Sequence, residues 1–184
     1  NIAEIHAALL TNGNPFLVYI SLLLIIVGFG YKISMAPFHY WTPDVYEGSP
    51  TPVTAFFSIG PKAAGFAILI RVIYTLFTKE GGLDATVSLY GLNWTLIFAV
   101  LAAITMTIGN FLALHQENIK RLLAYSSISH VGFMLIGFSV IGKEALTAVL
   151  FYLVIYFFMT LSAFYIAILV KNEFARQFSN IYII

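Results

Sequence analysis

Three side chains that can carry a proton stand in stretches of the chain that are otherwise almost entirely apolar: Lys32, Lys62 and His130. Lys62 is the only charged residue of FFSIGPKAAGFAILI and lies ~15 Å into an apolar segment at a rise of 1.5 Å per residue. An amine at that depth costs on the order of 2.5–3.5 kcal/mol, so it faces protein or water rather than lipid. Burial disfavours a charged amine and a nearby carboxylate favours it, so a changing partner can load and unload a proton. These residue types therefore predict a proton relay.

Two of the three residues also have structural interpretations. Lys32 would lie at the membrane surface if its helix ended near Met35, and would be interior if the helix broke there and resumed. His130 would be an ordinary interior histidine if it were bonded to Ser126 or Ser129. The same serines would alternatively order water into a hydrogen-bonded chain, and the sequence does not decide between these roles.

The remaining basic side chains fit structural roles better. Arg71 stands near a helix end and is expected to extend to the membrane surface. Lys120 and Arg121 open an apolar segment and are expected to anchor its topology. His39 is expected to be an amphipathic residue at the interface.

Composition places the chain in the membrane. Of 184 residues, 60% are hydrophobic and only 9% are charged, whereas soluble domains contain about 25% charged residues. There is no cysteine, which excludes disulfides and thiolate-ligated iron–sulfur clusters. The four histidines are scattered, and neither a phosphate-binding loop nor a basic cluster is present. We therefore expect no metal site, no cofactor and no nucleic-acid partner.

The expected fold is an all-α polytopic membrane protein. A membrane span needs about 20 apolar residues, and five stretches qualify. They cover approximately residues 16–35, 52–77, 92–114, 118–141 and 145–170. The first is expected to break near Met35–Pro37, because four of the six prolines fall between positions 37 and 52. A broken helix at membrane depth survives only where protein or a hydrated cavity covers its backbone.

The two ends of the sequence suggest that it belongs to a longer protein. It begins with Asn1 rather than methionine and ends in an apolar run. We expect residues 1–184 to be a single transmembrane segment of a larger proton-translocating domain, or one product of a split gene.

Two stretches resemble the antiporter-like membrane subunits of respiratory complex I, and most closely the N-type, called subunit 2 in mitochondria. They are GFGYKISMAPFHYWTPDVYEGSPTPVTAFFSIGPK and NIKRLLAYSSISHVGF. The specific feature is a lysine, then PFHYWTPDVYEGSPTPV, then a second lysine thirty residues after the first. Sodium/proton antiporter subunits and membrane-bound hydrogenase subunits share a looser version of this motif.

The resemblance implies an inverted-repeat fold in which each repeat contains a broken helix. By that resemblance, Lys32 matches the lysine of the first broken helix, Lys62 the lysine of the following helix, and His130 a position on a central hydrophilic axis. It also implies a bacterial or mitochondrial inner membrane. The implied partners are lipid, the other membrane-arm subunits, and whatever supplies the missing helices, including a glutamate partner for Lys32.

Three functions follow as hypotheses. The first is a proton-translocating subunit of an NADH:quinone oxidoreductase that carries no redox cofactor of its own. The second is a subunit of a multi-subunit cation/proton antiporter with the same fold. The third is a structural module whose polar residues only join helices.

Overall fold

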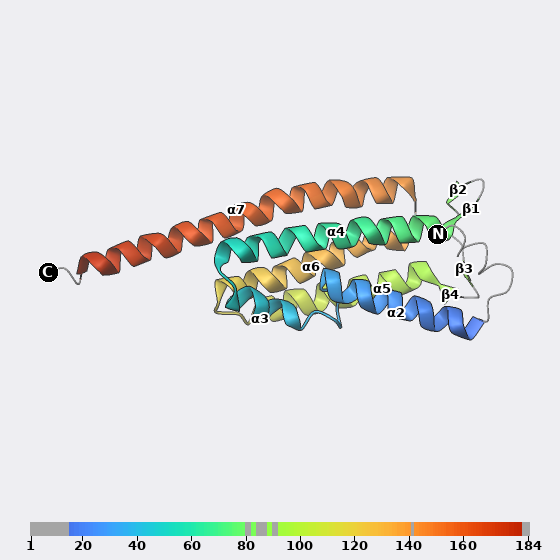
Figure 1. Ribbon diagram of the computed structural model, residues 1–184, viewed down its shortest axis with the longest axis horizontal. Coiled ribbons are helices and arrows are strands. Elements are labelled where there is room, and N and C mark those ends of the chain that lie inside the picture. Colours follow the sequence, from blue (N-terminus) through green and yellow to red (C-terminus); the bar gives the residue numbers. More distant parts are fainter. Residues whose placement is uncertain (1–14, 80–81, 84–87, 90–91, 141, 182–184) are drawn as a thin grey trace.

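The computed structural model describes residues 15–79, 82–83, 88–89, 92–140 and 142–181, and these form a bundle of long helices (Figure 1). In chain order they are α2 (Pro15–Ile33), α3 (Trp41–Gly48), α4 (Thr51–Phe77), α5 (Trp94–Ala113), α6 (Ile119–Val140) and α7 (Lys143–Ile181). Within the described residues, four segments are long and apolar enough to cross a bilayer: Thr51–Ile73, Trp94–Ala113, Ile119–Val140 and Lys143–Glu173. The first expected span corresponds to α2, whose apolar stretch is shorter, Tyr19–Ile33. The chain is a multi-pass helical membrane protein, as its composition predicts.

The connection between α4 and α5 contains two short antiparallel ladders. One pairs β1 (Thr78–Lys79) with β2 (Gly82–Leu83), and the other pairs β3 (Ser88–Leu89) with β4 (Leu92–Asn93). Asn93 then starts α5, because its side-chain oxygen accepts a hydrogen bond from the N–H of Leu96 at 3.1 Å. The ladders lie between the C-terminus of α4 and the N-terminus of α5, on the side of the bundle opposite α3 (Figure 1).

The predicted helix break is confirmed, since α2 ends at Ile33 and the chain becomes helical again only in α3. Ser34 has a left-handed backbone conformation with φ 65°. The N–H of Ala36 donates to Thr105 Oγ1 of α5 at 3.2 Å, and Thr42 Oγ1 donates to Ser34 Oγ at 2.7 Å. Non-helical backbone in a membrane requires such partners, because lipid offers none.

Thr105→Val is expected to destabilise the helix break, because it keeps the shape of the side chain but removes the acceptor of the buried Ala36 N–H. An unsatisfied buried donor costs about 1–3 kcal/mol, which should lower the thermal unfolding midpoint of the purified protein. The matched control is Thr107→Val, since the exposed Thr107 hydroxyl bonds only to the Ala103 carbonyl of its own helix. Equal midpoints for the two variants would contradict this role of Thr105.

Helix α4 continues without interruption through Gly60 and Pro61, although that pair disfavours a regular helix. Pro61 has no N–H to donate to the carbonyl four residues earlier. The next carbonyl along, that of Ser58, accepts a hydrogen bond from the hydroxyl of Tyr156 on α7 at 3.2 Å. A neighbouring helix therefore supplies a donor to the backbone at the weak point of α4.

Aromatic rings fill the core where α4, α5 and α6 meet. The ring of Phe66 lies 6.1 Å from that of Phe138, and the ring of Phe98 lies 5.7 Å from it. All three side chains are almost completely buried. A separate, smaller apolar cluster packs around Tyr46 of α3.

Helices α5 and α6 approach each other closely at Gly109. A Cβ at this position would lie 2.6 Å from the backbone nitrogen of Ser129, so only glycine fits without moving a helix. Beside this contact, Ser129 Oγ donates to Asn110 Oδ1 at 2.8 Å. The packing fixes α6, which carries Ser127 and His130.

Candidate functional site

Lys62 lies in the interior of the bundle, with 1% of its surface exposed. Its Nζ donates to Ser127 Oγ of α6 at 2.7 Å and lies 5.9 Å from the centre of the Tyr46 ring on α3. Within the described part of the chain, no carboxylate forms an ion pair with it. The amine therefore occupies a junction of α3, α4 and α6, next to a hydroxyl and an aromatic ring.

Two hydroxyl side chains, those of Thr54 and Ser58, precede Lys62 on the buried face of α4. Thr54 Oγ1 donates to the carbonyl of Tyr46 at 3.2 Å, and Ser58 Oγ donates to the carbonyl of Ala55 at 2.7 Å. Both hydroxyls thus bond to backbone. Thr54 thereby stabilises the connection between α3 and α4, Ser58 bonds within its own helix, and the partner of Lys62 comes from α6.

A partly enclosed cavity of about 140 Å³ lies between α6 and α7, next to the Lys62–Ser127 hydrogen bond. It is lined by Leu123, Ser126, Ser127, His130, Tyr156, Met159, Thr160 and Ala163. Ser127 reaches both the cavity and the amine, so it joins Lys62 to this space. The volume and the hydroxyl and imidazole groups in the wall suit ordered water.

His130 is half-buried in the wall of this cavity, and its Nδ1 lies 2.7 Å from the hydroxyl of Tyr152 on α7. The described hydrogen bond of the imidazole is thus with Tyr152, and not with Ser126 or Ser129, the partners considered for an ordinary interior histidine. Its ring lies 5.4 Å from that of Tyr156 and it interacts electrostatically with Lys62. The structure thus brings Lys62 and His130 into one site.

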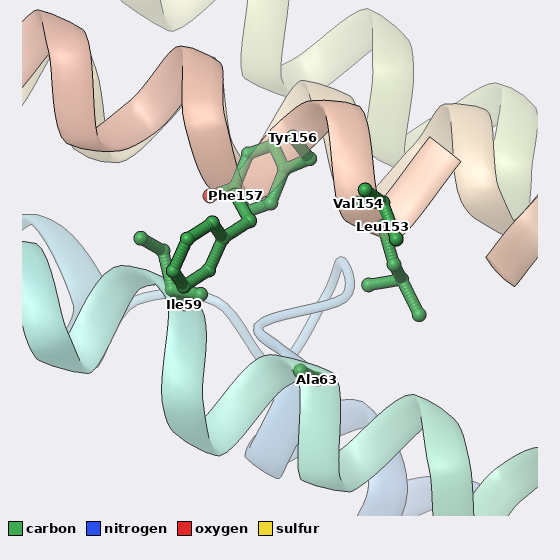
Figure 2. A pocket seen from close by; sticks show the side chains of 6 residues that line it. All are labelled: Ile59, Ala63, Leu153, Val154, Tyr156 and Phe157. Atoms are coloured by element: carbon green, nitrogen blue, oxygen red, sulfur yellow. The ribbon is translucent and has the colours of Figure 1, made fainter. Parts of the chain in front are cut away.

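A second cavity, of about 250 Å³, lies between α4 and α7 and is apolar (Figure 2). It is lined by Ile59, Ala63, Leu153, Val154, Tyr156 and Phe157. Tyr156 is the residue that this cavity shares with the polar one. Tyr156 therefore borders both a polar space and an apolar space in the same bundle.

Lys32 does not join the site formed by Lys62 and His130. It lies in the last turn of α2, beside the helix break, and its side chain is exposed on the described bundle. Its Cγ is 3.5 Å from the place that a Cβ would take on Gly65, which follows Lys62 by one turn on α4. Lys32 thus approaches the helix of Lys62, while its amine remains outside the buried cluster.

A charged cluster that the sequence does not predict joins α3 to the start of α6. Arg121 Nη1 lies 2.7 Å from Asp44 Oδ1 and 2.8 Å from Glu47 Oε2. Lys120 Nζ donates to the carbonyl oxygens of Glu47 at 3.0 Å and Ser49 at 2.8 Å. The two basic residues therefore hold the C-terminal end of α3. The spacing of Asp44 and Glu47, which places both on one face of a short helix, is the signal that would have revealed the cluster.

His39 is buried rather than amphipathic at an interface, which corrects the expectation from sequence. It is 2% exposed, and its ring stacks on that of Tyr40 with centres 4.5 Å apart. Desolvation lowers the pKa of His39, and a backbone hydrogen bond at Pro37 opposes that effect. No described contact joins it to Lys62, so it lies outside the site.

Comparison with protein families gives a match over nearly the whole chain. Residues 1–183 match the family Proton_antipo_M, described as NADH:quinone oxidoreductase/Mrp antiporter, transmembrane. NADH-quinone oxidoreductase subunit N 2 of Sorangium cellulosum is 53% identical over 159 residues, covering 86% of this chain and 31% of that protein. The chain spans about a third of the length of the curated relatives that it matches.

Two solved structures share the fold. One is the membrane-bound sulfane sulfur reductase, an archaeal respiratory membrane complex, with a TM-score of 0.70 and 30% identity over 87% of this chain and 31% of the matched chain. The other is respiratory complex I from Thermus thermophilus, with a TM-score of 0.59 and 32% identity over 86% of this chain and 35% of the matched chain. The resemblance inferred from the two sequence stretches is thus confirmed at the level of the family.

Proposed function

Because this chain belongs to the NADH:quinone oxidoreductase/Mrp antiporter transmembrane family, we propose that it is a proton-translocating part of the membrane arm of an NADH:quinone oxidoreductase. In this proposal the chain moves protons, and electron transfer takes place in other subunits. The relatives that are named as subunit N support this assignment. The complete enzyme would act as a translocase in a bacterial or mitochondrial inner membrane.

The observation that carries the proposal is the buried Lys62 amine, bonded to Ser127 in the wall of a cavity that also contains His130. In the proposed relay, Lys62 takes up a proton and releases it toward Ser127. Water in the cavity then conducts it to His130, whose Nδ1 is 2.7 Å from the Tyr152 hydroxyl. A hydroxyl both donates and accepts a hydrogen bond, which suits Ser127 and Tyr152 to such a path.

Lys32 is the proposed donor to Lys62. It stands at the break between α2 and α3, one helix away from the buried amine. Its exposed side chain is available to a carboxylate on a neighbouring helix of the complete protein. A carboxylate that approaches and withdraws would alternately favour and disfavour its charged form, and so would drive proton release.

The proposed partners are the other membrane-arm subunits and the helices that complete this fold. Large apolar side chains are exposed along α7, including Phe151 at 67% and Phe158 at 63%. Apolar surface of this kind on a membrane-spanning helix is covered by lipid or by other helices.

A cation/proton antiporter subunit is the second candidate, because the family description includes the Mrp antiporters. The relay would be the same, but a sodium gradient rather than NADH oxidation would drive it. The named subunit N relatives favour the first candidate.

The test uses the complete enzyme that contains this chain, reconstituted into lipid vesicles with a pH-sensitive dye inside. NADH and quinone are added, and protons taken up per NADH oxidised are measured. We expect proton uptake in the wild type and its loss in Lys62→Ala. Proton uptake driven by a sodium gradient instead of NADH would favour the antiporter. Undiminished uptake by Lys62→Ala would overturn the relay and support a purely structural role.

A further inference from the structure

Tyr46 is a buried residue that the relay does not use, although it lies against the amine of Lys62. It is 0% exposed, and the Lys62 nitrogen is 5.9 Å from the centre of its ring. Its hydroxyl approaches Ser127 and Ser58. It nevertheless has no hydrogen-bond partner of normal geometry among the described residues. The group of Tyr46 that contacts Lys62 is therefore the ring rather than the hydroxyl.

An aromatic ring face attracts a cation within about 6 Å of its centre, and the attraction is larger when both groups are removed from water. Lys62 meets both conditions. Its one described hydrogen-bond acceptor, Ser127 Oγ, is neutral, so the ring is the additional group that stabilises a positive charge there. The ring lies on α3, whereas Ser127 lies on α6, so the two groups hold the amine from different helices.

We propose that Tyr46 is a positioning residue for Lys62, whose ring face stabilises the protonated amine and keeps it beside Ser127. This inference rests on the proposed function, because it gives Tyr46 a role in the same proton relay. It assigns that role to the aromatic face and none to the phenolic hydroxyl.

The position of the ring depends on contacts outside its own helix. Helix α3 has eight residues, too few to be stable alone, so tertiary contacts set its orientation. Phe164 of α7 packs edge-on against the Tyr46 ring with centres 6.3 Å apart, and Thr54 donates to the Tyr46 carbonyl. At the C-terminal end of α3, Arg121 binds Glu47. The ion pairs of Arg121 with α3 therefore help to keep the Tyr46 ring next to the Lys62 amine.

The test measures NADH-driven proton uptake by the complete enzyme in vesicles as a function of pH. Tyr46→Leu removes the ring, and Tyr46→Phe removes only the hydroxyl. The alkaline limb of the profile should move to lower pH by roughly 0.5–1.5 pH units in Tyr46→Leu, because the protonated amine loses its aromatic partner. Tyr46→Phe should keep the wild-type profile.

Other titratable groups lie near this junction, and their effects on the pH profile must be distinguished from that of Lys62. They are His130 on α6, Tyr152 and Tyr156 on α7, and Lys32 on α2. Neither histidine nor tyrosine ordinarily carries positive charge in the alkaline range. Lys32 lies outside the buried cluster and makes no described contact with the Tyr46 ring. A shift that depends on the ring at position 46 therefore reports on Lys62.

Two further variants keep the test decisive. Incorporation of 3,4,5-trifluorophenylalanine at position 46 preserves the shape of phenylalanine but weakens the negative ring face, so the alkaline limb should move toward that of Tyr46→Leu. This comparison holds even if Tyr46→Leu fails to assemble. Phe98→Leu removes a buried ring that packs against Phe138 rather than against Tyr46, and its profile should remain that of the wild type.

The outcomes separate this inference from the proposed function. Identical profiles for phenylalanine and trifluorophenylalanine at position 46 would overturn the role of the ring. A Tyr46→Phe profile that shifts as far as that of Tyr46→Leu would assign the effect to the hydroxyl and also overturn it. Undiminished proton uptake by Lys62→Ala would instead refute the proposed function.

Discussion

Lys62→Met is expected to lower NADH-driven proton uptake by roughly 100-fold, because a positioned proton-transfer group contributes about 10²–10⁴-fold to a rate. Methionine isolates this effect better than alanine, since its flexible side chain refills most of the buried space. Ser127 Oγ also donates to the Ala124 carbonyl at 2.7 Å, so its hydroxyl keeps a partner when the amine is removed. The measurement is the initial rate of uptake in vesicles, normalised to the amount of assembled enzyme.

Two variants control for that result. Lys62→Arg keeps a positive charge but cannot release a proton, because a guanidinium is effectively always charged in proteins. It should therefore lose uptake as completely as Lys62→Met. Lys143→Met alters an exposed lysine at the start of α7 and should retain uptake. Normal uptake by Lys62→Arg would show that the charge alone matters and would contradict proton transfer through Lys62.

Gly109→Ala is expected to prevent normal packing of α5 against α6. The new Cβ would lie 2.6 Å from the Ser129 nitrogen and 2.9 Å from its Cα, and backbone cannot rotate away as a side chain can. The helices must separate, which weakens the hydrogen bond between Ser129 and Asn110 and leaves voids nearby. Overpacking of this kind costs about 1–3 kcal/mol. We expect a lower unfolding temperature and reduced assembly of the purified enzyme.

The matched control is Gly28→Ala, which makes the same chemical change in α2. No described atom beyond the adjacent backbone of α2 lies within 4 Å of a Cβ at position 28, and alanine is the better helix former. Wild-type or slightly higher stability is expected there. Equal unfolding temperatures for Gly109→Ala and Gly28→Ala would contradict the close approach of α5 and α6 at Gly109.

The sequence predicts most of the helical architecture because lipid permits few alternatives. A run of about 20 apolar residues must be helical to satisfy its own backbone. The expected span over 52–77 therefore agrees with α4 at Thr51–Phe77, and that over 118–141 agrees with α6 at Ile119–Val140. The break between α2 and α3 is predicted for the complementary reason, since closely spaced prolines cannot donate to a helix.

The contacts of the site are much less predictable, because they depend on which helix faces meet. Burial of Lys62 follows from its central position in an apolar run. Its partners are Tyr46 of α3 and Ser127 of α6. Only the packing of the helices determines that these two side chains meet Lys62. For the same reason, Tyr152 rather than a nearby serine binds His130. The assignment of Lys32, Lys62 and His130 as a relay stays a prediction until the variants are measured.

Tyr156 has a consequence for inhibition. Its side chain lines both the apolar cavity between α4 and α7 and the polar cavity that contains His130. A small nonpolar molecule bound in the apolar cavity would contact Tyr156 and disturb the hydrogen bond from its hydroxyl to the Ser58 carbonyl, one turn before Lys62. If protons move through the polar cavity as proposed, an inhibitor need not be polar, because an apolar compound bound in the neighbouring cavity would act on the relay through Tyr156.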